Sequence, residues 1–213
     1  MLNLLNIVAS LTKDAVTIIV EKNLLTFAVR SMKMASLSNL AENDQIQYDE
    51  DSENDFFDVA IAALDVMREI ASCGKGATEI LYEYSDGVDH GIVPEIWNFL
   101  NDQNQLNLIT AAMLTLLEII KYSTEENQNW MAQNGLFEVL AIIFDTLPNV
   151  FLEKAVYGLC EIIKIADEEA NKILLEAILG SKNLIEKLTE LSQDEDRKDI
   201  NPVCLEILAR TEM

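Results

Sequence analysis

Residues 127–166 read NQNWMAQNGLFEVLAIIFDTLPNVFLEKAVYGLCEIIKIA and form the clearest copy of a unit that recurs along the chain. A polar segment leads into a turn at Asn134-Gly135, where Gly tolerates the left-handed backbone between two helices. An apolar segment follows, and Pro148 separates it from a longer one. In the longer segment the apolar positions 151, 155, 159, 162, 163 and 166 share one helical stripe. The stretch therefore predicts a short helix, a turn, a medium helix and a long amphipathic helix.

Two signals repeat this unit about every 43 to 49 residues. Turns before an apolar helix start are predicted 68, 44 and 48 residues apart, at Asn23, Gly91, Gly135 and Asn183. A glutamate followed by isoleucine recurs at intervals of 49, 43 and 45, at Glu69, Glu118, Glu161 and Glu206. Six residues earlier stand small side chains that would let helices pack closely, Ala63, Ala112 and Ala155, whereas the fourth copy has Ile200. Periods of this length are typical of stacked helical repeats.

An insertion explains the long first interval. No basic residue lies between Lys33 and Arg68, and residues 40–54 are predominantly acidic and polar. Such a segment buries too little apolar surface to order itself, so it predicts a loop. Ser52, three residues before Asp55, resembles an acidic-directed phosphorylation site and is a candidate regulatory residue; the alternative is a solvated tether.

The whole chain is predicted to be all-α and to form one domain over residues 1–213. Few Gly and Pro residues interrupt it, and no stretch alternates as a strand does. Ser123, with Glu126 three residues on, predicts a capping box before the helix that begins at 125. The acidic residues 167–169 predict the start of another helix. The predicted helices span residues 2–11, 14–21, 24–38, 55–72, 77–84, 92–101, 104–122, 125–133, 136–146, 149–166, 169–179, 182–193 and 199–211.

The unit resembles the armadillo repeat, most closely in the approach of residues 127–136 to the Gly turn. The resemblance covers about four units and implies a right-handed α-α superhelix whose third helices line a concave surface. In the peptide-carrying armadillo proteins it implies an asparagine ladder on the third helix, with tryptophans one turn earlier. This chain instead has Glu69, Glu118, Glu161 and Glu206 at the asparagine positions, and Asp65, Leu114, Tyr157 and Pro202 at the tryptophan positions. Both ladders are replaced, which argues against a nuclear-import receptor.

The replacements predict a partner-binding surface. Its candidate residues are Asp65, Glu69, Leu114, Glu118, Tyr157 and Glu161. A row of carboxylates on one face would suit Lys or Arg side chains of a partner polypeptide. The alternative is a solvated face, because Glu118 with Lys121 and Glu161 with Lys164 are i,i+3 neighbours that pair weakly.

The net charge of −22 favours a basic protein partner and disfavours nucleic acid and anionic membranes. No apolar run is long enough to predict membrane insertion. The odd, widely spaced Cys73, Cys160 and Cys204 predict buried thiols in a reducing compartment, so we expect a cytoplasmic or nuclear protein.

Catalysis is not expected. The lone His90 predicts a surface or capping residue, and the sequence has no metal-binding, phosphate-loop or nucleophile motif. No cofactor is predicted. The favoured function is a scaffold or adaptor that binds a basic segment. One alternative is a chaperone cofactor, since some small armadillo proteins promote nucleotide release from heat-shock protein 70. Another is a self-associating module that forms a homodimer through its apolar terminal helices.

Overall fold

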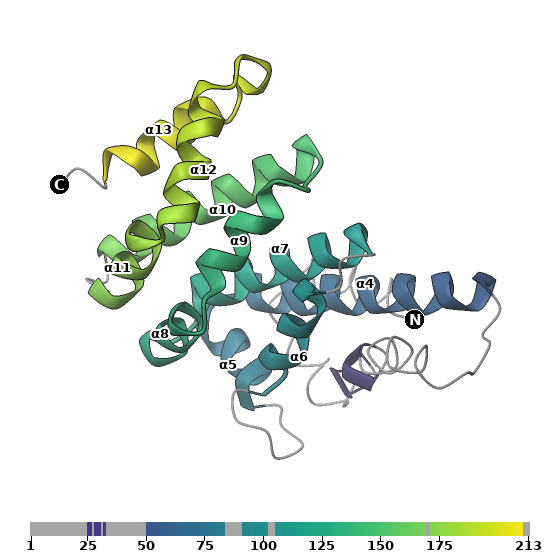
Figure 1. Ribbon diagram of the computed structural model, residues 1–213. Coiled ribbons are helices and arrows are strands. Elements are labelled where there is room, and N and C mark those ends of the chain that lie inside the picture. The colour runs from purple at the N-terminus through teal and green to yellow at the C-terminus, as the bar shows by residue number, and fades with distance from the viewer. Residues whose placement is uncertain are drawn as a thin grey trace. The chain divides into compact units, whose positions relative to one another are not determined.

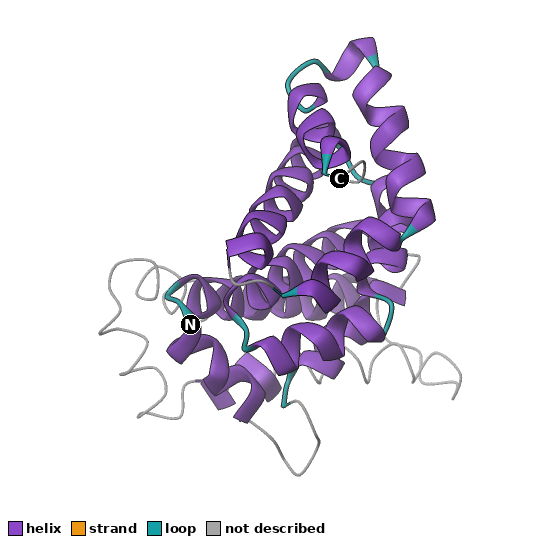
Figure 2. Ribbon diagram, turned by 90° about the vertical axis from the view of Figure 1, so that its left-hand side faces the viewer, coloured by secondary structure: helices purple, strands orange, loops and turns teal. Residues whose placement is uncertain are grey.

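The computed structural model describes residues 25–26, 28–30, 32, 50–83, 91–101, 105–168 and 171–210. Throughout these ranges the regular elements are helices, and no strand occurs among them (Figures 1 and 2). The predicted helices 2–11 and 14–21, most of 24–38, residues 40–49 of the acidic segment and His90 lie outside the described residues. The elements are α4 (Glu50–Ser72), α5 (Lys75–Glu83), α6 (Val93–Asn98), η2 (Phe99–Asn101), α7 (Leu106–Tyr122), α8 (Glu125–Gln133), α9 (Leu136–Phe144), α10 (Asn149–Glu168), α11 (Lys172–Gly180), α12 (Lys182–Gln193), η3 (Glu195–Arg197) and α13 (Asn201–Ala209).

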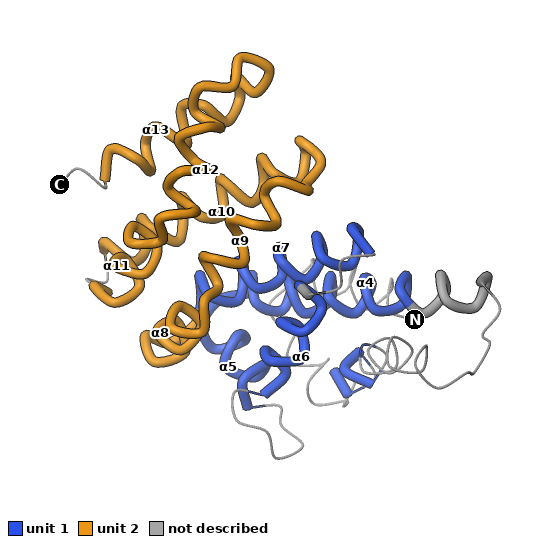
Figure 3. The backbone as a smooth tube through the Cα atoms, viewed as in Figure 1, with its two compact units in different colours: residues 1–122 blue, residues 123–213 orange. Residues whose placement is uncertain are grey.

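The chain divides into two compact units, residues 1–122 and 123–213 (Figure 3). In the first unit α4 packs along α7, and α5 and α6 also contact these helices. In the second unit α8 contacts α11, α9 contacts α12, and α10 contacts α13. First, second and third helices of successive triplets thus pack on their counterparts, as stacked repeats require. The expectation of one domain over 1–213 stays a prediction.

The predicted periodicity matches the buried core. Of the α10 stripe, residues 155, 159, 162, 163 and 166 are buried, and only Phe151 at its first turn is partly exposed. The small residues Ala63, Ala112 and Ala155 are fully buried. Thr115 of α7 adds a polar contact in the core of the first unit, because its hydroxyl donates to the carbonyl of Leu64 on α4 at 3.1 Å. Apolar burial and close helix approach therefore explain why the same spacing recurs in each repeat.

Two of the predicted turns have the backbone that glycine favours. Gly91 has φ 60° and Gly135 has φ 86°. Each lies just before the second helix of its triplet, α6 and α9 respectively. The turn predicted at Asn183 is wrong, because Asn183 lies inside α12. The chain turns instead at Ser181, whose φ of −72° and ψ of 97° any residue can adopt. No left-handed residue is needed there, so the Asn signal was misleading.

Helix α4 begins at Glu50, and the loop predicted over 40–54 is therefore wrong for residues 50–54. Residues 50–54 are largely acidic in sequence, and an acidic stretch is compatible with a helix start as well as with a loop. Acidity alone did not distinguish a loop from a helix start.

Capping also shifts two predicted helix starts. The N-cap of α8 is Thr124, whose side chain accepts from the Asn127 amide, and Ser123 is buried. Helix α11 is capped by Asn171, whose side chain accepts from the Leu174 amide. Residues 167 and 168, expected at the start of that helix, instead end α10. The side chain that reaches a free amide fixes each start.

Candidate functional site

The third helices carry every residue predicted to bind a partner. Asp65 and Glu69 lie on α4, Leu114 and Glu118 on α7, and Tyr157 and Glu161 on α10. None of the six side chains belongs to the buried core, and those on α10 are exposed. Glu69 and Glu118 belong to the first unit and Glu161 to the second. A carboxylate row that includes all three therefore stays a prediction.

In the first unit the acidic groups are partly neutralised by their own helix. Asp65 is 2.8 Å from the Arg68 guanidinium, and Glu118 is 3.6 Å from the Lys121 ammonium. The second of these is the i,i+3 pair expected from the sequence. Such pairs at partly exposed positions contribute little stability, so a partner's basic side chain could compete for either carboxylate.

In the second unit the face of α10 is open. Tyr157 is 46% exposed, and Glu153 and Glu161 are exposed one turn before and one turn after it. Spacing of i, i+4 and i+8 places the three side chains along one line of the helix. A phenol ring between carboxylates can bind a cation through both its ring face and the flanking charges. Sequence reasoning missed Glu153, although its spacing from Tyr157 was a usable signal.

An ion pair joins the two third helices of this unit. Lys164 of α10 is 3.0 Å from Glu206 of α13. The hydrogen bond with Glu206 is the main cause that raises the pKa of Lys164, and the neighbouring Cys160 is the second. Leu205, next to Glu206, is 56% exposed, so α13 also presents an apolar side chain. Neither feature could be read from one helix, because each depends on how α13 packs on α10.

Among the described side chains no metal-binding cluster occurs, and two of the three cysteines are buried. No group of three or more His, Cys, Asp or Glu residues in the described ranges could hold a metal ion. Burial, and then the nearby Glu206, raises the pKa of Cys160, and burial raises the pKa of Cys204 to about 11. Both thiols are therefore protonated and weakly nucleophilic near neutral pH. Cys73 differs from the prediction of a buried thiol, since it is only half-buried at the end of α4.

Alkylation should follow this order. Iodoacetamide at pH 7.5 is expected to modify Cys73 at least about tenfold faster than Cys160 or Cys204, because the latter two are buried and protonated. Peptide mass spectrometry at successive times measures each rate. Equal rates in guanidinium chloride would be the control, and early labelling of Cys204 in native protein would contradict the burial.

Two further points concern the described residues. Ser52 lies in the first turn of α4, so its role as a phosphorylation site stays a prediction. Among the described helices none combines the length and apolarity needed to cross a bilayer.

Comparison with known proteins identifies the architecture. No protein-family model and no curated protein sequence matches the chain. Two solved structures are similar over 97% of this chain and 91% of theirs. One is a designed armadillo repeat protein, YIII(Dq)4CqI, with a TM-score of 0.55 and 14% identity. The other is the designed armadillo repeat protein YIII(Dq.V1)4CPAF in complex with peptide (KR)4, with a TM-score of 0.56 and 15% identity.

The fold is an armadillo-like repeat. The expected all-α superhelical solenoid is thereby confirmed. In the second unit its repeats are the two stacked helix triplets α8–α10 and α11–α13. At this identity the similarity establishes the architecture and not the ligand.

Proposed function

We propose that this chain, with its armadillo-like fold, is a scaffold that binds a basic polypeptide segment on the faces of its third helices. The observation that carries the proposal is the exposed line of Glu153, Tyr157 and Glu161 on α10. Carboxylates recognise Lys and Arg through charge-assisted hydrogen bonds, and an aromatic ring contributes cation–π attraction.

Two further observations support a basic ligand. The net charge of −22 would accelerate encounter with a cationic segment and repel an anionic one. A designed protein of the same fold was solved in complex with the (KR)4 peptide, which alternates lysine and arginine. The fold can therefore present a surface to such a peptide, and the acidic third helices give this chain suitable chemistry. Heat-shock protein 70 exchange and homodimer formation stay predictions.

Charge reversal tests the proposal. Replacing Glu118 and Glu161 by lysine should weaken binding of a fluorescein-labelled (KR)4 peptide by more than about tenfold, because two attractive contacts become repulsive. Fluorescence anisotropy at 150 mM salt measures the affinity, and circular dichroism checks helicity.

The matched control is the double variant Glu138→Lys and Glu176→Lys. Both residues are exposed, and they lie on α9 and α11 instead of third helices. The control changes the net charge equally and should weaken binding less than about threefold, through long-range attraction alone. Equal losses in the two double variants would mean that the peptide binds through net charge and would overturn the proposed face.

A further inference from the structure

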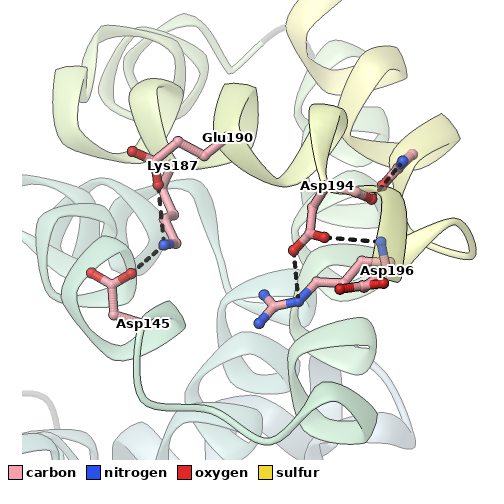
Figure 4. Close-up of polar contacts among 7 residues, drawn as sticks. Asp145, Lys187, Glu190, Asp194 and Asp196 are labelled. Carbon is pink, nitrogen blue, oxygen red and sulfur yellow. Dashed lines mark hydrogen bonds and ion pairs between the residues drawn. The ribbon is translucent and has the colours of Figure 1, made fainter.

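Two grooves among the described residues of the second unit contrast in one respect. The first lies between α9 and α12 and has a volume of about 250 Å³. Lys187 of α12 lines it and bonds to Asp145, the C-cap of α9, and, at 3.2 Å, to Glu190 of α12 (Figure 4). Its side chain is only 18% exposed. Here a lysine of the chain itself forms part of the groove wall, and its ammonium pairs with two of the carboxylates that line the groove.

The second groove, called the α10 groove below, lies between the start of α10 and the η3–α13 turn. Its volume is about 220 Å³. It combines an apolar surface with three acidic side chains, and these lining residues are Val150, Leu152, Ile200, Glu153, Asp196 and Asp199. Val150 is 63% exposed, which leaves an apolar side chain open to solvent beside three carboxylates. Like the first groove, it suits a side chain with an apolar stem and a cationic end.

The α10 groove has no counterpart of Lys187. In the described part of the chain no ion pair reaches Glu153, Asp196 or Asp199. Arg197 also borders the groove, but its Nε is 3.2 Å from the Asp194 carboxylate. The other oxygen of Asp194 accepts from the Asp196 amide at 3.0 Å, as Figure 4 shows. Asp194 thus shares the charge of Arg197 and holds the turn that presents Asp196.

We propose that the α10 groove accepts one Lys or Arg side chain from the partner polypeptide. The aliphatic stem lies on Val150 and Ile200, and the cationic end reaches the carboxylates. The ammonium of Lys187 makes ion pairs of this kind with carboxylates that line the first groove. The proposal rests on the proposed function, because the groove continues the binding line on α10. Glu153 borders the groove and is two turns, or about 12 Å, from Glu161. A segment lying along Tyr157 and Glu161 could therefore place one side chain in the groove.

Neutralising the groove tests this inference. The double variant Asp196→Asn and Asp199→Asn removes two charges while keeping side-chain size. It should weaken binding of labelled (KR)4 peptide to the full chain by roughly fivefold to thirtyfold, the range expected for two partly exposed ion pairs. Glu153→Gln, on the opposite wall, should weaken binding by roughly twofold to fivefold. Anisotropy at 150 mM salt measures both.

The control variant is Glu138→Gln with Glu176→Gln, which changes the net charge equally outside the groove and should cost less than about twofold. If the groove variants lose no more affinity for the peptide than this control does, the proposal that the α10 groove binds a side chain of the peptide is wrong. If Glu118→Lys with Glu161→Lys still loses the peptide in that case, the proposed binding face stands without it. Absence of (KR)4 binding to the unmodified chain would overturn both proposals.

Discussion

Replacing Gly91 by alanine is expected to lower the free energy of unfolding of the first unit by about 3 to 5 kcal/mol. Gly91 has φ 60°, where a Cβ atom is strained. That Cβ would also lie 2.2 Å from the Leu81 carbonyl oxygen and 2.4 Å from that of Tyr82. Both are backbone atoms of α5, and the Ile92 amide donates to the same Leu81 oxygen at 3.0 Å. The turn cannot open without losing this bond, so the clash has no inexpensive relief.

Urea unfolding followed by circular dichroism at 222 nm measures the loss, with two glycine variants as controls. Gly135→Ala has the backbone strain without the clash, since its nearest contact is the flexible Glu138 carboxylate at 3.6 Å, and should cost about 1 kcal/mol. Gly76 lies inside α5, where an added Cβ atom would meet no atom within 4 Å. Gly76→Ala should therefore raise the free energy of unfolding by about 0.5 to 1 kcal/mol. If Gly91→Ala costs no more than Gly135→Ala, the close approach to α5 is wrong.

The second large effect is expected at Asn171, whose side chain links the two helix triplets of the second unit, α8–α10 and α11–α13. Its Oδ1 accepts from the Leu174 amide at 3.1 Å and caps α11. Its Nδ2 donates to Gln128 Oε1 of α8 at 2.8 Å, and both residues are almost fully buried. Asn171→Ala removes the cap and leaves a buried Gln128 oxygen without this donor. The expected loss is about 2 to 4 kcal/mol, the sum of a lost cap and a desolvated acceptor.

Thr124→Ala is the matched control, because Thr124 caps α8 from an exposed position. It should cost only about 0.5 to 1 kcal/mol. Gln128→Met removes the other side of the buried bond, and the double variant should lose less than the sum of the two single losses. Urea unfolding gives all four values. If Asn171→Ala and Thr124→Ala lower the free energy of unfolding equally, the hydrogen bond between Asn171 and Gln128 contributes nothing. The same conclusion would follow if the losses of Asn171→Ala and Gln128→Met were strictly additive in the double variant.

Local sequence rules explain most of the correct predictions. A 3.6-residue apolar period with Gly at two turns predicted the helices from 125–133 onward, two of them, 125–133 and 182–193, to the residue. The repeat of Glu-Ile motifs placed Glu69, Glu118 and Glu161 on third helices, outside the buried core. These outcomes depend on interactions within one helix or one turn, which nearby residues specify completely. The errors at residues 50–54, Ser123 and Asn183 concern helix ends, where several polar residues compete for the same free amides.

The sequence by itself therefore determined the all-helical class, the repeat and the helix that carries each candidate residue. Only the tertiary structure decided that Lys164 pairs with Glu206 and that Lys187 pairs with Asp145. It also decided that three carboxylates meet at the α10 groove, where no ion pair among the described residues reaches them. Each of the two ion pairs joins residues 42 positions apart, in successive helix triplets of the second unit. Whether these residues meet depends on the offset at which one helix packs on the next. Side-chain volumes across the interface set this offset, and no local sequence pattern encodes it.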